Sequence, residues 1–256
     1  MFGIYDMNNC NKLTYKERLD IYKEAGFDEI ALYLDERYQR DDESYIEIIG
    51  YANKIGLKIK QVHIDYKISN LICDESTSEY FYYVSAKLVE AASFGIPYVV
   101  AHASMTDNPP QIPQSQIDKF ANMMKYLEAL PTTLCLENVR NNYNLEKLLS
   151  LNLPNVKMCF DLGHAHCYGN EQQLFNKFKK QIACSHLHNN FGKDSHNPLN
   201  QGEISYEFYL TELEKIKDSS NCLECFPEKG KILSKEEFAE FVKRCYQTIK
   251  AKPLEK

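Results

Sequence analysis

Short apolar segments alternate with longer amphipathic segments along this chain, and this alternation is the strongest constraint on its fold. The predicted strands are residues 2–7, 29–34, 58–64, 98–103, 133–139, 156–162, 182–188 and 221–226. Between and after them, apolar residues recur three and four positions apart, as in helices with one core-facing side. Strict alternation of strands and helices predicts parallel strands. Eight such units predict an α/β fold, a closed (β/α)8 TIM barrel, for which a length of 256 residues is ordinary.

Local signals at the ends of the amphipathic segments agree with this pattern. Gly26, Gly56 and Gly95 stand where helix C-caps are expected, and Ser205 and Ser234 stand where N-caps are expected. No Gly-rich phosphate loop follows the first strand, which argues against a dinucleotide-binding Rossmann sheet. No linker or change of composition divides the chain, so we predict one domain over residues 1–256.

Composition narrows the class of protein. The net charge is −6 and the pI about 5.7, which argues against a broad nucleic-acid surface because such domains are usually basic. Several of the nine cysteines lie inside apolar runs, as reduced, buried thiols of a cytoplasmic protein do. The N-terminus lacks the pattern of a signal peptide, and no apolar run approaches the roughly 18 residues of a membrane span. We therefore expect a cytoplasmic protein with no membrane partner.

Polar side chains collect at the ends of the predicted strands. The residues there are His63, His102, Glu137, Asp161, His164, His186, His188, Asp194, His196 and Glu224. The carboxyl ends of barrel strands meet at one face, where the loops that follow them build the active site. Imidazole and carboxylate groups pointing into one mouth are the ligand mixture that zinc, manganese or iron sites use. The sequence therefore predicts a divalent-metal site.

The stretch C-F-D-L-G-H-A-H at residues 159–166 is the densest part of this pattern. Asp161 and His164 leave the sixth strand together, and Gly163 between them is expected to let the chain turn sharply. Both side chains can then reach the mouth of the barrel. For His166, two residues further on, we expect a structural role.

At these positions the chain resembles the xylose isomerase-like TIM-barrel superfamily, which includes sugar isomerases and epimerases and the endonuclease IV type of apurinic endonucleases. The motifs that carry the resemblance run over essentially the whole chain. They are H-I-D-Y, A-H-A-S, L-E-N-V, F-D-L-G-H, H-L-H-N-N, D-S-H with a downstream G-E-I, and L-E-C.

The resemblance implies a particular set of metal ligands. The core ligands of the family match Glu137, Asp161, His186 and Glu224. The endonuclease branch adds ligands to hold three zinc ions, and its additional positions match His63, His102, His164, Asp194 and His196. All nine positions are therefore present in this sequence.

Other features favour sugar chemistry over DNA. The same nine-residue pattern is similar to that of short bacterial barrels grouped with sugar-phosphate isomerases, although the Asp of their H-L-H-D-N stretch is Asn189 here. The loop that follows the second strand, D-E-R-Y-Q-R-D-D-E-S, is largely acidic and offers DNA phosphates little attraction. Tyr66 matches an aromatic that the endonucleases push into DNA, but it equally suits the wall of a small-molecule pocket.

The resemblance thus implies a metal-dependent isomerase or epimerase of a small-molecule sugar or sugar phosphate, acting through a metal-stabilised enediolate. Glu137 and Glu224 are the expected catalytic carboxylates, which pass a proton between neighbouring carbons. His188, Tyr66 and Arg140 are expected to bind substrate. The expected cofactor is one to three ions of zinc or manganese per chain.

Three alternatives remain open at this point. One is a zinc-dependent, endonuclease IV-like phosphodiesterase that acts at abasic DNA sites, the only case in which nucleic acid is a partner. The second is a barrel that binds metal or sugar without catalysis, and the third is lyase or dehydratase chemistry on the same fold. Oligomerisation is compatible with the sequence, which does not define it.

Overall fold

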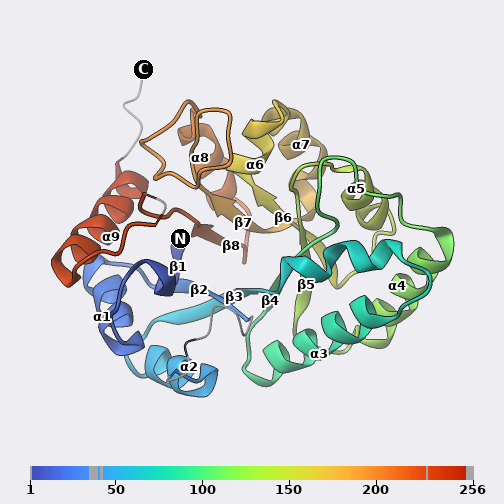
Figure 1. Cartoon of the computed structure of the whole chain (residues 1–256), viewed down its shortest axis with the longest axis horizontal. Coiled ribbons are helices and arrows are strands. Elements are labelled where there is room, and N and C mark those ends of the chain that lie inside the picture. The colour runs from blue at the N-terminus through green and yellow to red at the C-terminus, as the bar shows by residue number, and fades with distance from the viewer. Residues whose placement is uncertain (1, 35–39, 41–42, 229, 252–256) are drawn as a thin grey trace.

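The computed structural model describes residues 2–34, 40, 43–228 and 230–251. Its strands form one closed parallel barrel in sequence order, closed by pairing of the first strand with the last (Figure 1). The strands are β1 (Phe2–Tyr5), β2 (Glu29–Tyr33), β3 (Lys58–His63), β4 (Tyr98–His102), β5 (Thr133–Glu137), β6 (Val156–Asp161), β7 (Ile182–Leu187) and β8 (Ser220–Leu223). The predicted (β/α)8 TIM barrel is therefore confirmed.

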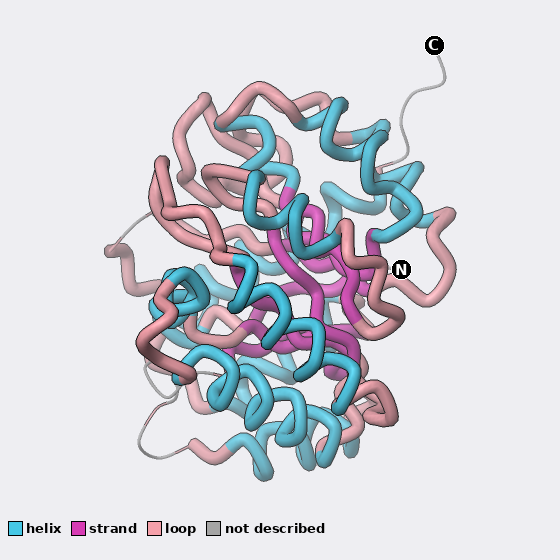
Figure 2. Tube along the Cα trace, turned by 90° about the vertical axis from the view of Figure 1, so that its right-hand side faces the viewer, coloured by secondary structure: helices cyan, strands magenta, loops and turns pink. Residues whose placement is uncertain are grey.

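Helices surround the strands on the outside of the barrel (Figures 1 and 2). The α-helices are α1 (Tyr15–Ala25), α2 (Tyr45–Lys54), α3 (Glu79–Ser93), α4 (Gln114–Tyr126), α5 (Tyr143–Leu149), α6 (Leu162–Cys167), α7 (Glu171–Phe178), α8 (Glu207–Glu214) and α9 (Lys235–Lys250). Three 3-10 segments are η1 (Asn8–Cys10), η2 (Tyr66–Cys73) and η3 (Lys179–Gln181). None of the helices in the described part of the chain combines the length and the apolar character needed to cross a membrane.

The local end signals hold with one exception. Gly26, Gly56 and Gly95 follow α1, α2 and α3 with the positive φ of a helix C-terminus. Ser234 caps α9 through the amide of the residue three positions on, in a complete capping box. The N-cap predicted at Ser205 is wrong, because α8 begins one residue later, after Tyr206, which makes no side-chain cap.

The strands are apolar on both faces, but the two faces belong to different cores. Along β5, Leu134 and Leu136 belong to the large core between strands and helices, whereas Cys135 packs with Cys159 and Cys184 in a separate cluster. Alternate residues of a strand point to opposite faces, so the cysteines point into the barrel. Glu137, two residues after Cys135, lies on the same inner face. The alternation along the strand thus places Glu137 at the end of the barrel, directly above the cysteine thiols of the barrel interior.

A buried ionic network fastens the first two βα units together. The guanidinium of Arg18 in α1 donates to both carboxylate oxygens of Asp6, at 2.9 and 3.0 Å, and to both of Glu43, at 2.9 and 2.8 Å. Tyr22 also donates to Asp6. Arg18 is fully buried, so its charge depends on these partners. The acidic loop predicted between β2 and α2 lies mostly outside the described residues, which omit 35–39 and 41–42.

Candidate metal centre

Strand register brings the predicted polar residues together at the carboxyl end of the barrel. His102 on β4 lies beside Glu137 on β5, and Asp161 on β6 lies beside His186 on β7. Glu224 follows β8 directly and donates its backbone N–H to β7. The last inward-facing side chains of neighbouring strands therefore lie close together at the carboxyl end of the barrel.

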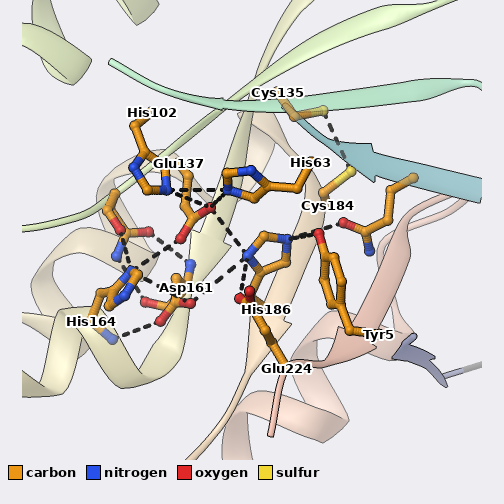
Figure 3. A network of polar contacts seen from close by, with 12 residues as sticks. Tyr5, His63, His102, Cys135, Glu137, Asp161, His164, Cys184, His186 and Glu224 are labelled. Carbon is orange, nitrogen blue, oxygen red and sulfur yellow. Dashed lines mark hydrogen bonds and ion pairs between the residues drawn. The ribbon is translucent and has the colours of Figure 1, made fainter. Parts of the chain in front are cut away.

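The four predicted core ligands form one buried group, with one ligand atom from each lying within 4.8 Å of the others: Glu137, Asp161, His186 and Glu224. The Nδ1 atom of His186 is 3.2 Å from Oε2 of Glu137 and 3.0 Å from Oε2 of Glu224 (Figure 3). Neither this Nδ1 nor Oδ2 of Asp161 has a hydrogen-bond partner among the described residues. Buried acceptors that converge without donors fit a divalent cation.

Three residues that the sequence analysis did not select orient this group. Oη of Tyr5 and Oε1 of Gln61 lie 2.9 and 3.1 Å from Nε2 of His186. A proton on that Nε2 leaves Nδ1 as the acceptor that faces the carboxylates. Tyr33 donates to Oε1 of Glu224 at 2.7 Å. Gln61 was detectable, because it stands two residues before His63 on the same strand and therefore points to the same inner face.

A second group joins Glu137 to the histidines of β3 and β4. Nε2 of His63 lies 3.1 Å from Oε2 of Glu137 and 3.2 Å from Nε2 of His102. The other nitrogen of His63, Nδ1, donates to the carbonyl of Ile64 at 2.7 Å, so its Nε2 is a free lone pair when the ring is neutral. Two imidazole lone pairs this close to a carboxylate need a proton or a cation between them.

A third group contains His164, His188, Asp194 and His196. His164 connects it to the others, since its Nδ1 lies 3.0 Å from Oε1 of Glu137 and its Nε2 lies 3.4 Å from Oδ2 of Asp194. Nε2 of His196 lies 3.1 Å from Oδ1 of Asp194. All nine residues predicted as metal ligands therefore belong to possible ligand groups. Glu137 is a member of both the core and the second group, whereas the third group shares no member with them and contacts Glu137 through His164.

Mutual electrostatics keep the carboxylates charged. Burial alone would raise the pKa of Glu137, but His186 and His102 hold that pKa well below its usual range. Burial also acts against ionisation of Glu224, but His186 lowers its pKa below the ordinary value. For His196, burial lowers the pKa, yet Asp194 and Glu224 raise it to about 9. Protonated imidazoles can compensate these buried carboxylates, and a bound cation would supply the same positive charge while leaving Nδ1 of His186 free as a ligand.

A cavity of about 310 Å³ opens above these groups. This volume is at the small end of the range for ligand pockets, roughly 300–1,000 Å³. Tyr66 and Arg140 both line it, as do Glu137 and Glu224. The Tyr66 ring stacks on His102 with 6.0 Å between ring centroids. Arg140 is half exposed at the rim, with Nη1 3.4 Å from Oδ1 of Asp107.

His188, predicted to bind substrate, follows β7 and is a member of the third group. It is fully buried and is not among the residues that line the cavity. Its Nε2 lies 3.1 Å from Oδ1 of Asp161, and its ring stacks on His196 with 4.0 Å between centroids. These contacts support Asp161 and His196, and binding of substrate by His188 stays a prediction.

Gly163 also has a different role from the sharp turn predicted for it. It lies inside α6, and the helix is capped by Asp161, whose carboxylate accepts the N–H of His164 at 2.6 Å. A Cβ atom on Gly163 would lie 2.0 Å from Cε1 of His188. Glycine is required here because the imidazole packs against the backbone, not because the chain bends.

Replacing Gly163 by Ala is expected to push the His188 ring from its position and to destabilise the protein by about 1–3 kcal/mol, as overpacking of a core does. Thermal unfolding and metal content of the purified variant are the measurements. The matched control is Gly50→Ala in α2, where an added Cβ meets nothing within 4 Å. That change is expected to stabilise by roughly 0.5–1 kcal/mol. Equal stability of the two variants would contradict the packing argument.

Asn189, which replaces the acid of the related H-L-H-D-N stretch, holds the loop that follows β7. Its side-chain amide donates to the carbonyls of Leu199 at 2.6 Å and Ile204 at 3.3 Å. Its Oδ1 accepts the backbone N–H groups of Asn190 and Ile204. A carboxylate has no N–H to donate, so this clamp is specific to the amide.

Comparisons with known proteins agree with the fold. Residues 19–245 match the model of the xylose isomerase-like TIM barrel family. A fusion of a xylose isomerase-like TIM barrel with 4-hydroxyphenylpyruvate dioxygenase is 14% identical with a TM-score of 0.75, covering 95% of this chain and 42% of that chain. The chain thus spans less than half of that fusion protein. A comparison with curated proteins found no match.

Two further solved structures span nearly the whole of both chains. A 3-keto-D-glucoside 4-epimerase from E. coli is 14% identical, has a TM-score of 0.71 and covers 97% of this chain and 98% of that chain. An AP endonuclease of family 2 from Brucella melitensis is 17% identical, has a TM-score of 0.70 and covers 94% and 97%. At these identities the likeness shows a shared fold and leaves the reaction open.

Proposed function

Because the chain belongs to the xylose isomerase-like TIM barrel family, we propose that it is a divalent-metal-dependent isomerase or epimerase of a sugar or sugar phosphate. The observation that carries the proposal is that Glu137 and Glu224, on either side of His186, line one cavity of about 310 Å³. Two ionised carboxylates facing a sugar-sized space suit the removal and return of a proton on neighbouring carbons.

Glu137, Asp161, His186 and Glu224 would hold the metal ion. When bound, such an ion polarises a substrate carbonyl and stabilises the negative charge that remains after a proton is removed. The convergence of buried, unpartnered acceptor atoms from Asp161 and His186 is the structural basis for assigning the ion to this group.

The chain's own residues account for proton transfer and orientation. Both oxygens of Glu137 face imidazoles, whereas Glu224 has Tyr33 on one oxygen and His186 on the other. Four imidazoles among the described residues lie within 3.4 Å of Glu137, whereas His186 is the one that contacts the carboxylate of Glu224. Glu224 is therefore the less enclosed of the two and the better placed to take a proton from substrate. Tyr66 and Phe226 supply aromatic wall to the same cavity, on which the apolar face of a sugar can pack.

Solvent hydrogen exchange tests the proposal directly. The metal-loaded protein is incubated in D₂O with D-fructose, D-tagatose, D-psicose and D-fructose 6-phosphate, and proton NMR follows the position next to the carbonyl. Loss of that signal with at least one sugar, abolished by a chelator, is the expected result. Metal-loaded protein that exchanges none of them would contradict the proposal.

The endonuclease alternative is favoured by one observation, the assembly of all nine ligand positions in three neighbouring groups. The charge of the cavity opposes it. Among the described residues that line the cavity, Arg140 is the only Lys or Arg, and DNA affinity depends on many phosphate contacts. Cleavage of a duplex with one abasic site, compared with the intact duplex, would establish this alternative and displace sugar chemistry.

The metal content of two variants distinguishes the core group from the second group. Asp161→Asn is expected to lose the most tightly held ion, because Asp161 belongs to the core group, while the amide keeps the helix cap. His63→Ala is expected to retain that ion, since His63 belongs only to the second group. Mass spectrometry of each variant after gel filtration gives the ratio of metal to chain. Equal retention by the two variants would show that the core group is not the principal site.

A further inference from the structure

Each of the four core residues is preceded, two positions earlier on its strand, by a cysteine. The pairs are Cys135 and Glu137, Cys159 and Asp161, Cys184 and His186, and Cys222 and Glu224. Residues two apart on a strand point to the same face, so these thiols lie one layer beneath the four ligands. All four are fully buried. The floor of the candidate metal centre is therefore a layer of thiols.

The four thiols do not have the same surroundings. Cys159 forms a possible ligand group with Glu137 and His186, with one ligand atom from each within 4.8 Å of the others. Glu137 and His186 are also members of the core group. Cys184 instead contacts Cys135, with 3.5 Å between the sulfurs, and this contact lies apart from the carboxylates in Figure 3. Among the described residues, no ligand group includes Cys184.

We propose that Sγ of Cys159 is an additional ligand of the ion held by the core group, and that it biases the centre toward thiophilic ions. The inference rests on the proposed function, because it needs that ion. Asp161 Oδ2 and His186 Nδ1, both fully buried and without a hydrogen-bond partner among the described residues, supply independent evidence that a ligand belongs here. Thiolate ligands select Zn²⁺ and similar ions over Mn²⁺ and Mg²⁺, which prefer oxygen.

A buried cysteine is often no more than a small apolar side chain. That role would apply equally to Cys159 and Cys184, which lie on neighbouring strands and pair in register. The two thiols are therefore a matched pair for a test. Replacing either by Ala removes the same atoms from the same interior layer, but of the two only Cys159 shares a possible ligand group with Glu137 and His186.

Cobalt supplies the readout. The metal-free protein is loaded with Co²⁺, and its absorption spectrum is recorded for the wild type, Cys159→Ala and Cys184→Ala. A thiolate bound to cobalt gives a near-ultraviolet charge-transfer band, separate from the visible bands of any bound cobalt. We expect the ultraviolet band in the wild type and in Cys184→Ala, and its loss in Cys159→Ala with the visible bands retained.

Metal selectivity is a second readout. The ratio of the affinity for Zn²⁺ to the affinity for Mn²⁺ should fall roughly tenfold or more in Cys159→Ala.

The opposing outcomes are distinct. Bound cobalt without the ultraviolet band in the wild type, or a band that persists in Cys159→Ala, would overturn the inference and leave the proposed function standing. A band lost equally in both variants would also overturn it, because the effect would not be specific to Cys159. A wild-type protein that binds no cobalt, zinc or manganese would overturn the inference and the proposed function together.

Discussion

Replacing Glu137 by Gln is expected to lower the rate of solvent hydrogen exchange by about 10²–10⁴-fold, the range for loss of a general acid or base. The change should also reduce metal binding, because Glu137 belongs to the core group and to the group of His63 and His102. The amide keeps the size of the side chain but removes the negative charge that faces the imidazoles. Exchange rates by NMR and metal content by mass spectrometry measure the two effects.

The control for this variant is Glu203→Gln. Glu203 is an exposed glutamate whose Oε2 lies 4.0 Å from His166, outside the ligand groups. Its replacement should leave both exchange and metal content unchanged. Full exchange activity in Glu137→Gln, with metal bound, would exclude Glu137 from proton transfer.

Replacing Arg18 by Met is expected to destabilise the protein by about 3–5 kcal/mol, the usual cost of removing one partner from a buried ion pair. The variant leaves the carboxylates of Asp6 and Glu43 buried without the guanidinium that donates to all four of their oxygens. For a chain of this size, the midpoint of thermal unfolding should fall by roughly 10 °C. Thermal unfolding followed by circular dichroism is the measurement.

An exposed ion pair provides the comparison. Lys23 and Asp28 lie 2.8 Å apart, with side chains 36% and 51% exposed. Lys23→Met should cost no more than about 1 kcal/mol, because water and salt screen such pairs. A similar loss of stability in both variants would show that burial does not set the importance of the Arg18 network.

The fold, and the gathering of polar side chains at one end of the barrel, could be predicted from the sequence because each depends on a short-range pattern. The periodicities of strands and helices are visible within a few neighbouring residues. Once one residue of a barrel strand is assigned to the inner face, every second residue of that strand points inward as well. Their positions at strand ends assign Glu137, Asp161, His186 and Glu224 to one mouth, whereas their choice as the core ligands follows from the family resemblance and stays a prediction.

Contacts between layers could not be predicted in the same way. Gly163 and His188 are 25 positions apart, and their contact depends on how α6 sits against β7. The same holds for Tyr5 and Tyr33, whose hydroxyls reach His186 and Glu224 across the barrel. Both tyrosines fit an apolar strand, so their polar ends gave no signal. The N-cap prediction at Ser205 was wrong for a related reason, since the residue at which α8 begins depends on how the helix packs against the barrel.

The register that assembles the centre has a consequence for the connectivity of the chain. The ligands leave the carboxyl ends of six strands or lie in the loops that follow, whereas Gly56 and Gly95 mark turns that enter strands from the opposite end. A Cβ at either glycine would meet nothing within 4 Å, so these turns are open to solvent. Circular permutants with new termini at these turns should keep the order of hydrogen-bonded strands, provided that the original ends are joined by a linker long enough to span them. We therefore expect the centre to depend on the order and register of the paired strands and not on where the polypeptide starts.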